Sequence, residues 1–258
     1  MGIFNDYVSA IDECAIPEMP VNHIANIKNI EGFLAKNGIS NDYLIEKCEV
    51  FGEHYLYIFY GRAAFKLNKH DAFPMCFVFK KPTIQPVKSF PFDSGAFHHD
   101  RMEKYFFNTK LTLDDFDFSG NNDYIYRVIN HFFENNAAYY DEKNKSAVPD
   151  DGIPAIKGYL EMIADDRNDK LDGRKSAIEL IYDFPFHFSN GLELVILPEF
   201  DLKFSTGNIT FNQLKTILQT RYGCDVKSYS NRMTDPVESS YKEIKKIVKS
   251  HIKNNGGL

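Results

Sequence analysis

The sequence predicts a single α+β domain over residues 1–258, with a central mixed or largely antiparallel sheet flanked by helices. Strand-like aromatic runs occur in both halves of the chain, and amphipathic helical spacings separate them. Aromatic residues make up 15% of the chain, with 23 Phe, 15 Tyr and no Trp. A chain of 258 residues with a 43% hydrophobic content can bury a core without disulfides or metals. The best internal break is Pro149 to Gly152, in a loop expected near residues 143–152.

Composition also limits the class of protein. The longest apolar run, Tyr55 to Tyr60, is far too short to span a membrane, and the N-terminus lacks the pattern of a secretory signal. The four cysteines show no C-x-x-C spacing, which favours reduced thiols in the cytoplasm. The net charge of −6 argues against sequence-independent binding to nucleic acid.

The expected elements follow from apolar spacing, capping residues and turn signals. Helices are expected over 22–38, 41–51, 123–136, 153–166, 211–222 and 237–254. Strands are expected over 54–67, 74–80, 85–92, 176–184, 192–200 and 226–230. Residues 136–152 are expected to form an exposed loop. On the last helix, Lys242, Lys246, Lys249 and Lys253 form one basic stripe, which we interpret chiefly as a solvated face.

An arginine follows the first aromatic strand. Arg62 comes directly after Gly61, near Tyr60 and Tyr57. A guanidinium beside aromatic rings suits a ligand that carries both a phosphate and a flat ring. The alternative is a structural arginine that pairs with Asp93 or another carboxylate.

A second group of polar residues follows the strand expected over 85–92. Ser94 is a candidate donor to a substrate hydroxyl or phosphate, and Asp93 would orient Arg62 or a histidine, or cap its own backbone. The adjacent histidines His98 and His99 resemble a pair of metal ligands, but neighbouring residues on a strand point to opposite faces. We therefore predict no metal site here and expect His98 to contact substrate.

Carboxylates in the second half are the candidate catalytic groups. Glu179 lies within an apolar strand, where burial is costly unless the carboxylate has a partner, although it could also point to water on a half-exposed sheet. Asp172 and Arg174 precede this strand, and Arg174 is a candidate substrate contact. Glu193 lies at the start of the next strand and is the competing acid.

The order of Arg62, Ser94 and Glu179 resembles the arginine, serine and glutamate arrangement of ADP-ribosyltransferases. The string ELVILP, which contains Glu193, is similar to a strand of that family, but its register is shifted and the Ser-Thr-Ser triplet is absent. Three segments, YGRAAF, PFDSGAF and DGRKSAIE, are also similar to a family of bacterial proteins of unknown function.

The resemblance to ADP-ribosyltransferases implies NAD as substrate, a phosphate held by arginine, an aromatic residue on nicotinamide and a glutamate at the ribose. It implies transfer to a protein, a nucleic acid or water, as in a bacterial toxin or defence protein. Two other hypotheses stay open. One is a metal-dependent nuclease or phosphohydrolase that holds Mg²⁺ or Mn²⁺ with Asp93, His98, Asp172 and Glu179. The other is a non-catalytic binding or immunity protein.

Overall fold

The computed structural model describes residues 2–39, 47, 49–62, 64, 73–107, 109–145, 148–166, 172–230 and 236–258. Its helices are α1 (Ile3–Ser9), α2 (Ile30–Lys36), α3 (Ser94–His98), α4 (Glu103–Phe106), α5 (Tyr124–Phe133), α6 (Asn136–Tyr140), α7 (Pro154–Ala164), α8 (Phe211–Tyr222) and α9 (Val237–Asn254), with short 3-10 turns η1 (Ile27–Asn29), η3 (Leu113–Asp115) and η4 (Asp172–Ser176). Its strands are β1 (Val21–Asn26), β2 (Gly38–Ile39), β3 (Leu56–Tyr60), β4 (Pro74–Phe79), β5 (Lys88–Phe90), β6 (Glu179–Tyr182), β7 (Phe186–His187), β8 (Leu192–Pro198), β9 (Leu202–Phe204), β10 (Gly207–Ile209) and β11 (Asp225–Tyr229).

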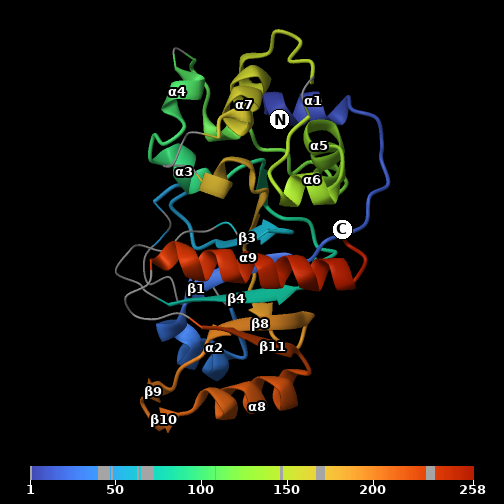
Figure 1. Cartoon of the computed structure of the whole chain (residues 1–258). Helices are drawn as coiled ribbons and strands as arrows, with labels where there is room; N and C mark the ends of the chain where they lie inside the picture. Colours follow the sequence, from blue (N-terminus) through green and yellow to red (C-terminus); the bar gives the residue numbers. More distant parts are fainter. Residues whose placement is uncertain are drawn as a thin grey trace.

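A seven-stranded sheet forms the centre of the molecule, in the order β11-β8-β4-β1-β3-β6-β5. Strands β11 and β8 are parallel, and the other neighbours are antiparallel. Helix α9 crosses one face of the sheet, α1, α5, α6 and α7 gather near one end, and α8 lies at the other (Figure 1). The predicted α+β class and the mainly antiparallel sheet are confirmed.

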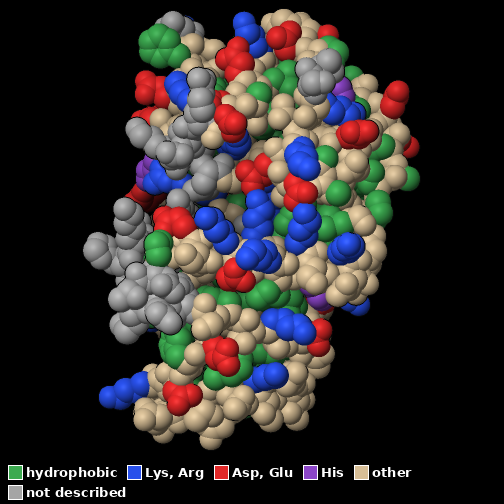
Figure 2. All heavy atoms as spheres, viewed as in Figure 1, with side chains coloured by type: hydrophobic (Ala, Val, Ile, Leu, Met, Phe, Trp, Pro, Cys, Tyr) green, Lys and Arg blue, Asp and Glu red, His purple; other side chains and the backbone are tan. Residues whose placement is uncertain are grey.

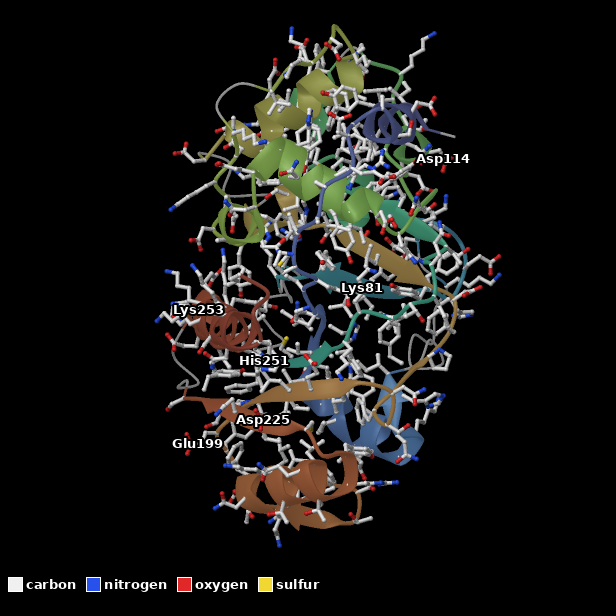
Figure 3. The ribbon with its side chains drawn as sticks, turned by 90° about the vertical axis from the view of Figure 1, so that its right-hand side faces the viewer. Lys81, Asp114, Glu199, Asp225, His251 and Lys253 are labelled. Carbon is white, nitrogen blue, oxygen red and sulfur yellow. The ribbon has the colours of Figure 1, made fainter. Side chains whose placement is uncertain are left out.

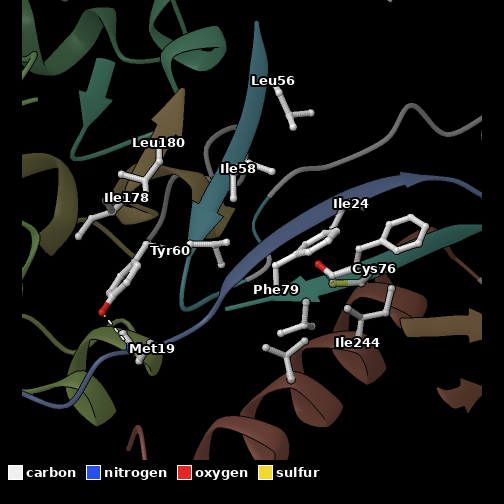
Figure 4. Close-up of a cluster of buried hydrophobic side chains, with 14 of the residues drawn as sticks. Met19, Ile24, Leu56, Ile58, Tyr60, Cys76, Phe79, Ile178, Leu180 and Ile244 are labelled. Atoms are coloured by element: carbon white, nitrogen blue, oxygen red, sulfur yellow. Dashed lines mark hydrogen bonds between the residues drawn. The ribbon is translucent and has the colours of Figure 1, made fainter. Parts of the chain in front are cut away.

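The sheet is buried on both faces. On β4, Phe77 packs edge-on against Phe33 of α2, and Cys76 lies on the side of Ile244 of α9 (Figure 4). All six residues of β4 are buried, which explains its continuous apolar sequence. Within the described ranges, no helix combines the length and apolar character needed to cross a bilayer.

The last helix has the two faces that its spacing predicts. Ile244 and Val248 are completely buried, whereas Lys242, Lys246 and Lys253 are exposed. Figure 2 shows basic side chains gathered over α9, and several of them pair with acids. The solvated-face interpretation of the lysine stripe is therefore supported.

Two predicted elements are wrong. The helix expected over 22–38 begins only at Ile30, because Val21–Asn26 pairs with β3 and β4 as a strand inside the sheet. That helix ends at the left-handed residue Asn37 and not at Gly38. Tertiary pairing here overrides a helical spacing that Ile24 and Ile27 happen to satisfy.

The loop expected over 136–152 is the second error. Asn135 caps α6 by accepting a hydrogen bond from Ala138 N, and Tyr139 and Tyr140 on this helix are completely buried. The strand expected over 85–92 is shorter, at Lys88–Phe90. The helix expected over 41–51 and the end of the strand expected over 54–67 fall largely outside the described residues.

Candidate active site

The end of β3 directs Arg62 into the protein. Phe59 pairs with Glu179 of β6, and Gly61 then adopts a left-handed conformation with φ +69°. A Cβ on Gly61 would lie 2.7 Å from Cε of Met19, so only glycine fits this turn without displacing its neighbour. The chain therefore turns inward, and Arg62 is only 1% exposed.

The guanidinium of Arg62 has protein partners on several sides. Its Nη2 donates to Oγ of Ser176 at 2.7 Å and to the carbonyl oxygen of Gly173 at 3.0 Å. Its Nη1 lies 3.2 Å from Oε1 of Glu142, and the guanidinium carbon lies 4.8 Å from the ring centre of Tyr139. The structural alternative, an arginine paired with a carboxylate, describes these contacts.

Two cationic side chains, Arg62 and Lys245, favour the ionised form of Glu142. Burial raises its pKa, but the positive charges of Arg62 and Lys245 outweigh that effect and lower the pKa below its ordinary value. Glu142 thus links the sheet to α9, which carries Lys245.

Tyr139 connects the ends of β3 and β6. Its hydroxyl donates to the carbonyl oxygen of Tyr60 and accepts from the backbone N–H of Ile178, both at 2.9 Å. The hydroxyl of Tyr60 accepts from the backbone N–H of Met19 (Figure 4). Tyr60 is therefore a buried structural residue. Tyr57, half-buried, lies on the opposite face of β3, which it shares with Phe59 and Glu179.

A buried pair of acids lies beside this network. The carboxylate of Asp93 caps α3 by accepting from Ala96 N at 2.7 Å, as the capping alternative predicts. The backbone N–H of Ser94 donates to Oε2 of Glu179 at 3.0 Å. Glu179 is 2% exposed, so the alternative in which it points to water is wrong. Burial and the negative charge of Asp93 raise its pKa to about 8, despite the hydrogen bond from Ser94.

The turn η4 joins the arginine to the acids. The carbonyl oxygen of Gly173 accepts from Arg62, and that of the next residue, Arg174, accepts from the backbone N–H of Asp93. The three positions that carry the resemblance, Arg62, Ser94 and Glu179, therefore belong to one buried hydrogen-bonded region. Arg174 itself is buried. The side chain of Asp172 is not among those that the structure describes.

The other candidate acid is not part of this region. Glu193 lies on β8, separated from β6 by β4, β1 and β3. Its Oε2 lies 3.1 Å from Nε2 of His251, on the side of α9 that faces β8 (Figure 3). The two candidate glutamates thus occupy different parts of the sheet.

The histidines lie on a helix and not on a strand, contrary to the prediction. His98 is the last residue of α3 and His99 follows it, and both are exposed, at the opposite end of the helix from Asp93. Among the described residues, neither Asp93 nor Glu179 belongs to a group of three potential metal ligands.

Sequence reasoning missed Tyr139, Glu142 and Ser176. The first two were assigned to an exposed loop, although the capping residue Asn135 and the Tyr139–Tyr140 pair are signals of a buried helical turn. Comparisons with protein-family models, curated proteins and solved structures give no match.

Proposed function

We propose that the chain cleaves the N-glycosidic bond of NAD and transfers ADP-ribose to a macromolecule or to water, with Glu179 as the catalytic carboxyl group. The observation that carries the proposal is the hydrogen bond from Ser94 to Glu179 within a region that also contains Arg62. Residues from three distant parts of the sequence, in the order of the resemblance, are linked there through η4.

The environment of Glu179 suits this chemistry. When nicotinamide leaves, positive charge develops at the ribose carbon, and a carboxylate stabilises it while the acceptor oxygen or nitrogen forms the new bond and gives up its proton. The raised pKa keeps Glu179 mostly protonated without a ligand. A cationic nicotinamide ring beside it would lower the pKa and ionise the group.

Other residues have supporting roles in the proposal. Arg62 positions η4, because its guanidinium is bound to Glu142, Gly173 and Ser176. Two aromatic side chains lie on the face of Glu179, and we assign the stacking on nicotinamide to the half-buried Tyr57 because Phe59 is only 2% exposed. Since Glu179 is 2% exposed, NAD reaches it only when the side chains that cover Glu179 move apart during turnover.

The proposal places the protein in the cytoplasm, as a toxin or defence protein. Cys14, Cys76 and Cys224 are free, which suits a reducing compartment.

The direct test is nicotinamide release from NAD by the purified full chain, measured by chromatography. Glu179→Gln should reduce the rate at least about a hundredfold. Glu193→Gln is the matched control and should retain the rate, because three strands separate Glu193 on β8 from Glu179 on β6. Absence of release by the wild type, or an unchanged rate in Glu179→Gln, would overturn the proposal.

The burial of the three residues that carry the resemblance favours a second candidate function, that of a non-catalytic interaction protein. Arg62, Ser94 and Glu179 are each at most 2% exposed, as expected of groups that hold a fold together. In that case nicotinamide is not released, and Arg62→Ala lowers the thermal unfolding midpoint without affecting any turnover. The nicotinamide assay separates the two functions.

A further inference from the structure

Three exposed side chains from two distant segments come together beside α3. Among the residues that the structure describes, Glu49, His98 and His99 are the one group of three potential ligands whose donor atoms all lie within 4.8 Å of one another. We propose that this group binds a divalent transition-metal ion, with Zn²⁺ as the best match. The proposal stands independently of any action on NAD.

The end of α3 places the two histidines side by side. His98 ends the helix, His99 has φ −91° and ψ 27°, and Asp100 is left-handed with φ 55°. Arg101 N donates to the carbonyl oxygen of Ala96 at 3.1 Å, which closes the turn. The imidazole rings are 5.2 Å apart between centres. On a strand they would point to opposite faces, whereas at this helix end they can share one ion.

Both segments are anchored in the aromatic core. Phe97, directly before His98, stacks on Phe92 with ring centres 5.7 Å apart. Phe51, two residues after Glu49, stacks on Phe90 at 5.9 Å. The backbones that carry the three ligands are therefore held in place while the ligands themselves face solvent.

The donor chemistry selects the metal. Two imidazole nitrogens and one carboxylate oxygen are typical of Zn²⁺ and its neighbours, whereas Mg²⁺ and Ca²⁺ prefer oxygen ligands. Zinc ligands lie about 2.0–2.2 Å from the ion, so donors must approach closer than 4.8 Å. Oε2 of Glu49 is already 3.9 Å from Nε2 of His99, and these side chains are 79% and 53% exposed, so rotation can close the remaining gap.

Three protein ligands leave a position for water or another donor. The ion would connect the turn that carries Glu49, which precedes β3, to the end of α3. It would lie at the opposite end of α3 from Asp93, outside the acid pair.

Titration of the full chain with ZnCl₂ by calorimetry tests the site. We expect one Zn²⁺ per chain, with affinity reduced at least about tenfold in each of His98→Gln, His99→Gln and Glu49→Gln. His187→Gln, at an exposed histidine of β7, is the matched control and should bind as the wild type does. MgCl₂ should give no comparable binding.

Absence of zinc binding by the wild type would overturn the proposal. So would binding that persists unchanged in the His98→Gln, His99→Gln double variant, because the ion would then lie elsewhere. Circular dichroism of each variant checks the fold, and zinc should raise the thermal unfolding midpoint of the wild type but not of the double variant.

Discussion

The backbone N–H of Ser94 donates to Oε2 of Glu179 at 3.0 Å, across 85 positions of sequence. One hydrogen bond does not compensate a buried carboxylate for the loss of water and for the nearby charge of Asp93. The protonated form of Glu179 is therefore favoured in the folded protein, which makes stability depend on pH.

Glu179→Gln should remove a loss of stability that develops between about pH 5 and pH 8. The folded pKa is about 8 and the ordinary value is 4.5, so between these values the unfolded chain binds fewer protons and the free energy of unfolding falls as pH rises. Glutamine mimics the neutral acid. We expect the variant to be close to the wild type near about pH 5 and more stable by a few kcal/mol near about pH 9.

Urea denaturation across this pH range measures the effect. Glu161→Gln, which changes an exposed carboxylate on α7, should show no such difference between low and high pH. If the free energies of unfolding of the wild type and of Glu179→Gln change with pH in parallel, the folded protein does not favour the protonated form of Glu179.

Glu142→Gln should destabilise the protein strongly. The substitution leaves the guanidinium of Arg62, 1% exposed, without its carboxylate partner. Breaking a buried ion pair in this way costs about 3–5 kcal/mol, and the 25% exposure of Glu142 places the expected loss at the lower end.

The preceding residue supplies a matched control. Asp141 pairs with Lys249 nearer the surface, and Asp141→Asn should cost about 0–1 kcal/mol. Both variants are compared by urea denaturation at neutral pH. Equal losses would mean that the pair of Arg62 and Glu142 has no special structural role.

Local patterns predicted much of the fold. The strand Pro74–Phe79 is apolar throughout because both of its faces are covered, and α8 begins after Thr210, a residue type typical of N-caps, whose side chain accepts from Gln213 N. Val21–Asn26 was not predicted as a strand, because its identity depends on hydrogen bonds to two partner strands that are distant in sequence.

The site was predicted only as a set of residues. The position of Glu179 in an apolar strand indicated that its carboxylate needs a partner, and one of the two interpretations of Arg62 was a pair with a carboxylate; the structure contains both contacts. The identity of the partners was not readable from spacing, because Glu142 contacts Arg62 only through the folding of α6 against β3 and β6.

Tyr139→Phe should weaken the connection between the ends of β3 and β6. The lost hydroxyl leaves the buried N–H of Ile178 without its acceptor, whereas the carbonyl oxygen of Tyr60 still accepts from the backbone N–H of Arg62 at 2.8 Å. One unsatisfied buried group costs about 1–3 kcal/mol, and we expect a loss in that range. Tyr159→Phe, which removes one longer bond of 3.3 Å to Pro91, should cost less in the same denaturation assay. A smaller loss for Tyr139→Phe than for Tyr159→Phe would contradict the bridging role.

Gly61→Ala should destabilise the protein more than Gly52→Ala, although both glycines have φ +69°. The strain of a left-handed alanine, about 1 kcal/mol, is common to both variants. A Cβ at Gly52 meets open space, whereas one at Gly61 meets Cε of Met19 at 2.7 Å. Because the clash is with the end of a flexible side chain, which can shift, we expect it to add about 1 kcal/mol, the lower end of the cost of overpacking. The difference between the two unfolding free energies therefore measures the packing of Met19 against the turn that directs Arg62 inward. Shortening Met19 to Ala in the Gly61→Ala background should relieve the added clash. Equal losses of stability for the two glycine variants would show that the turn at Gly61 tolerates a side chain.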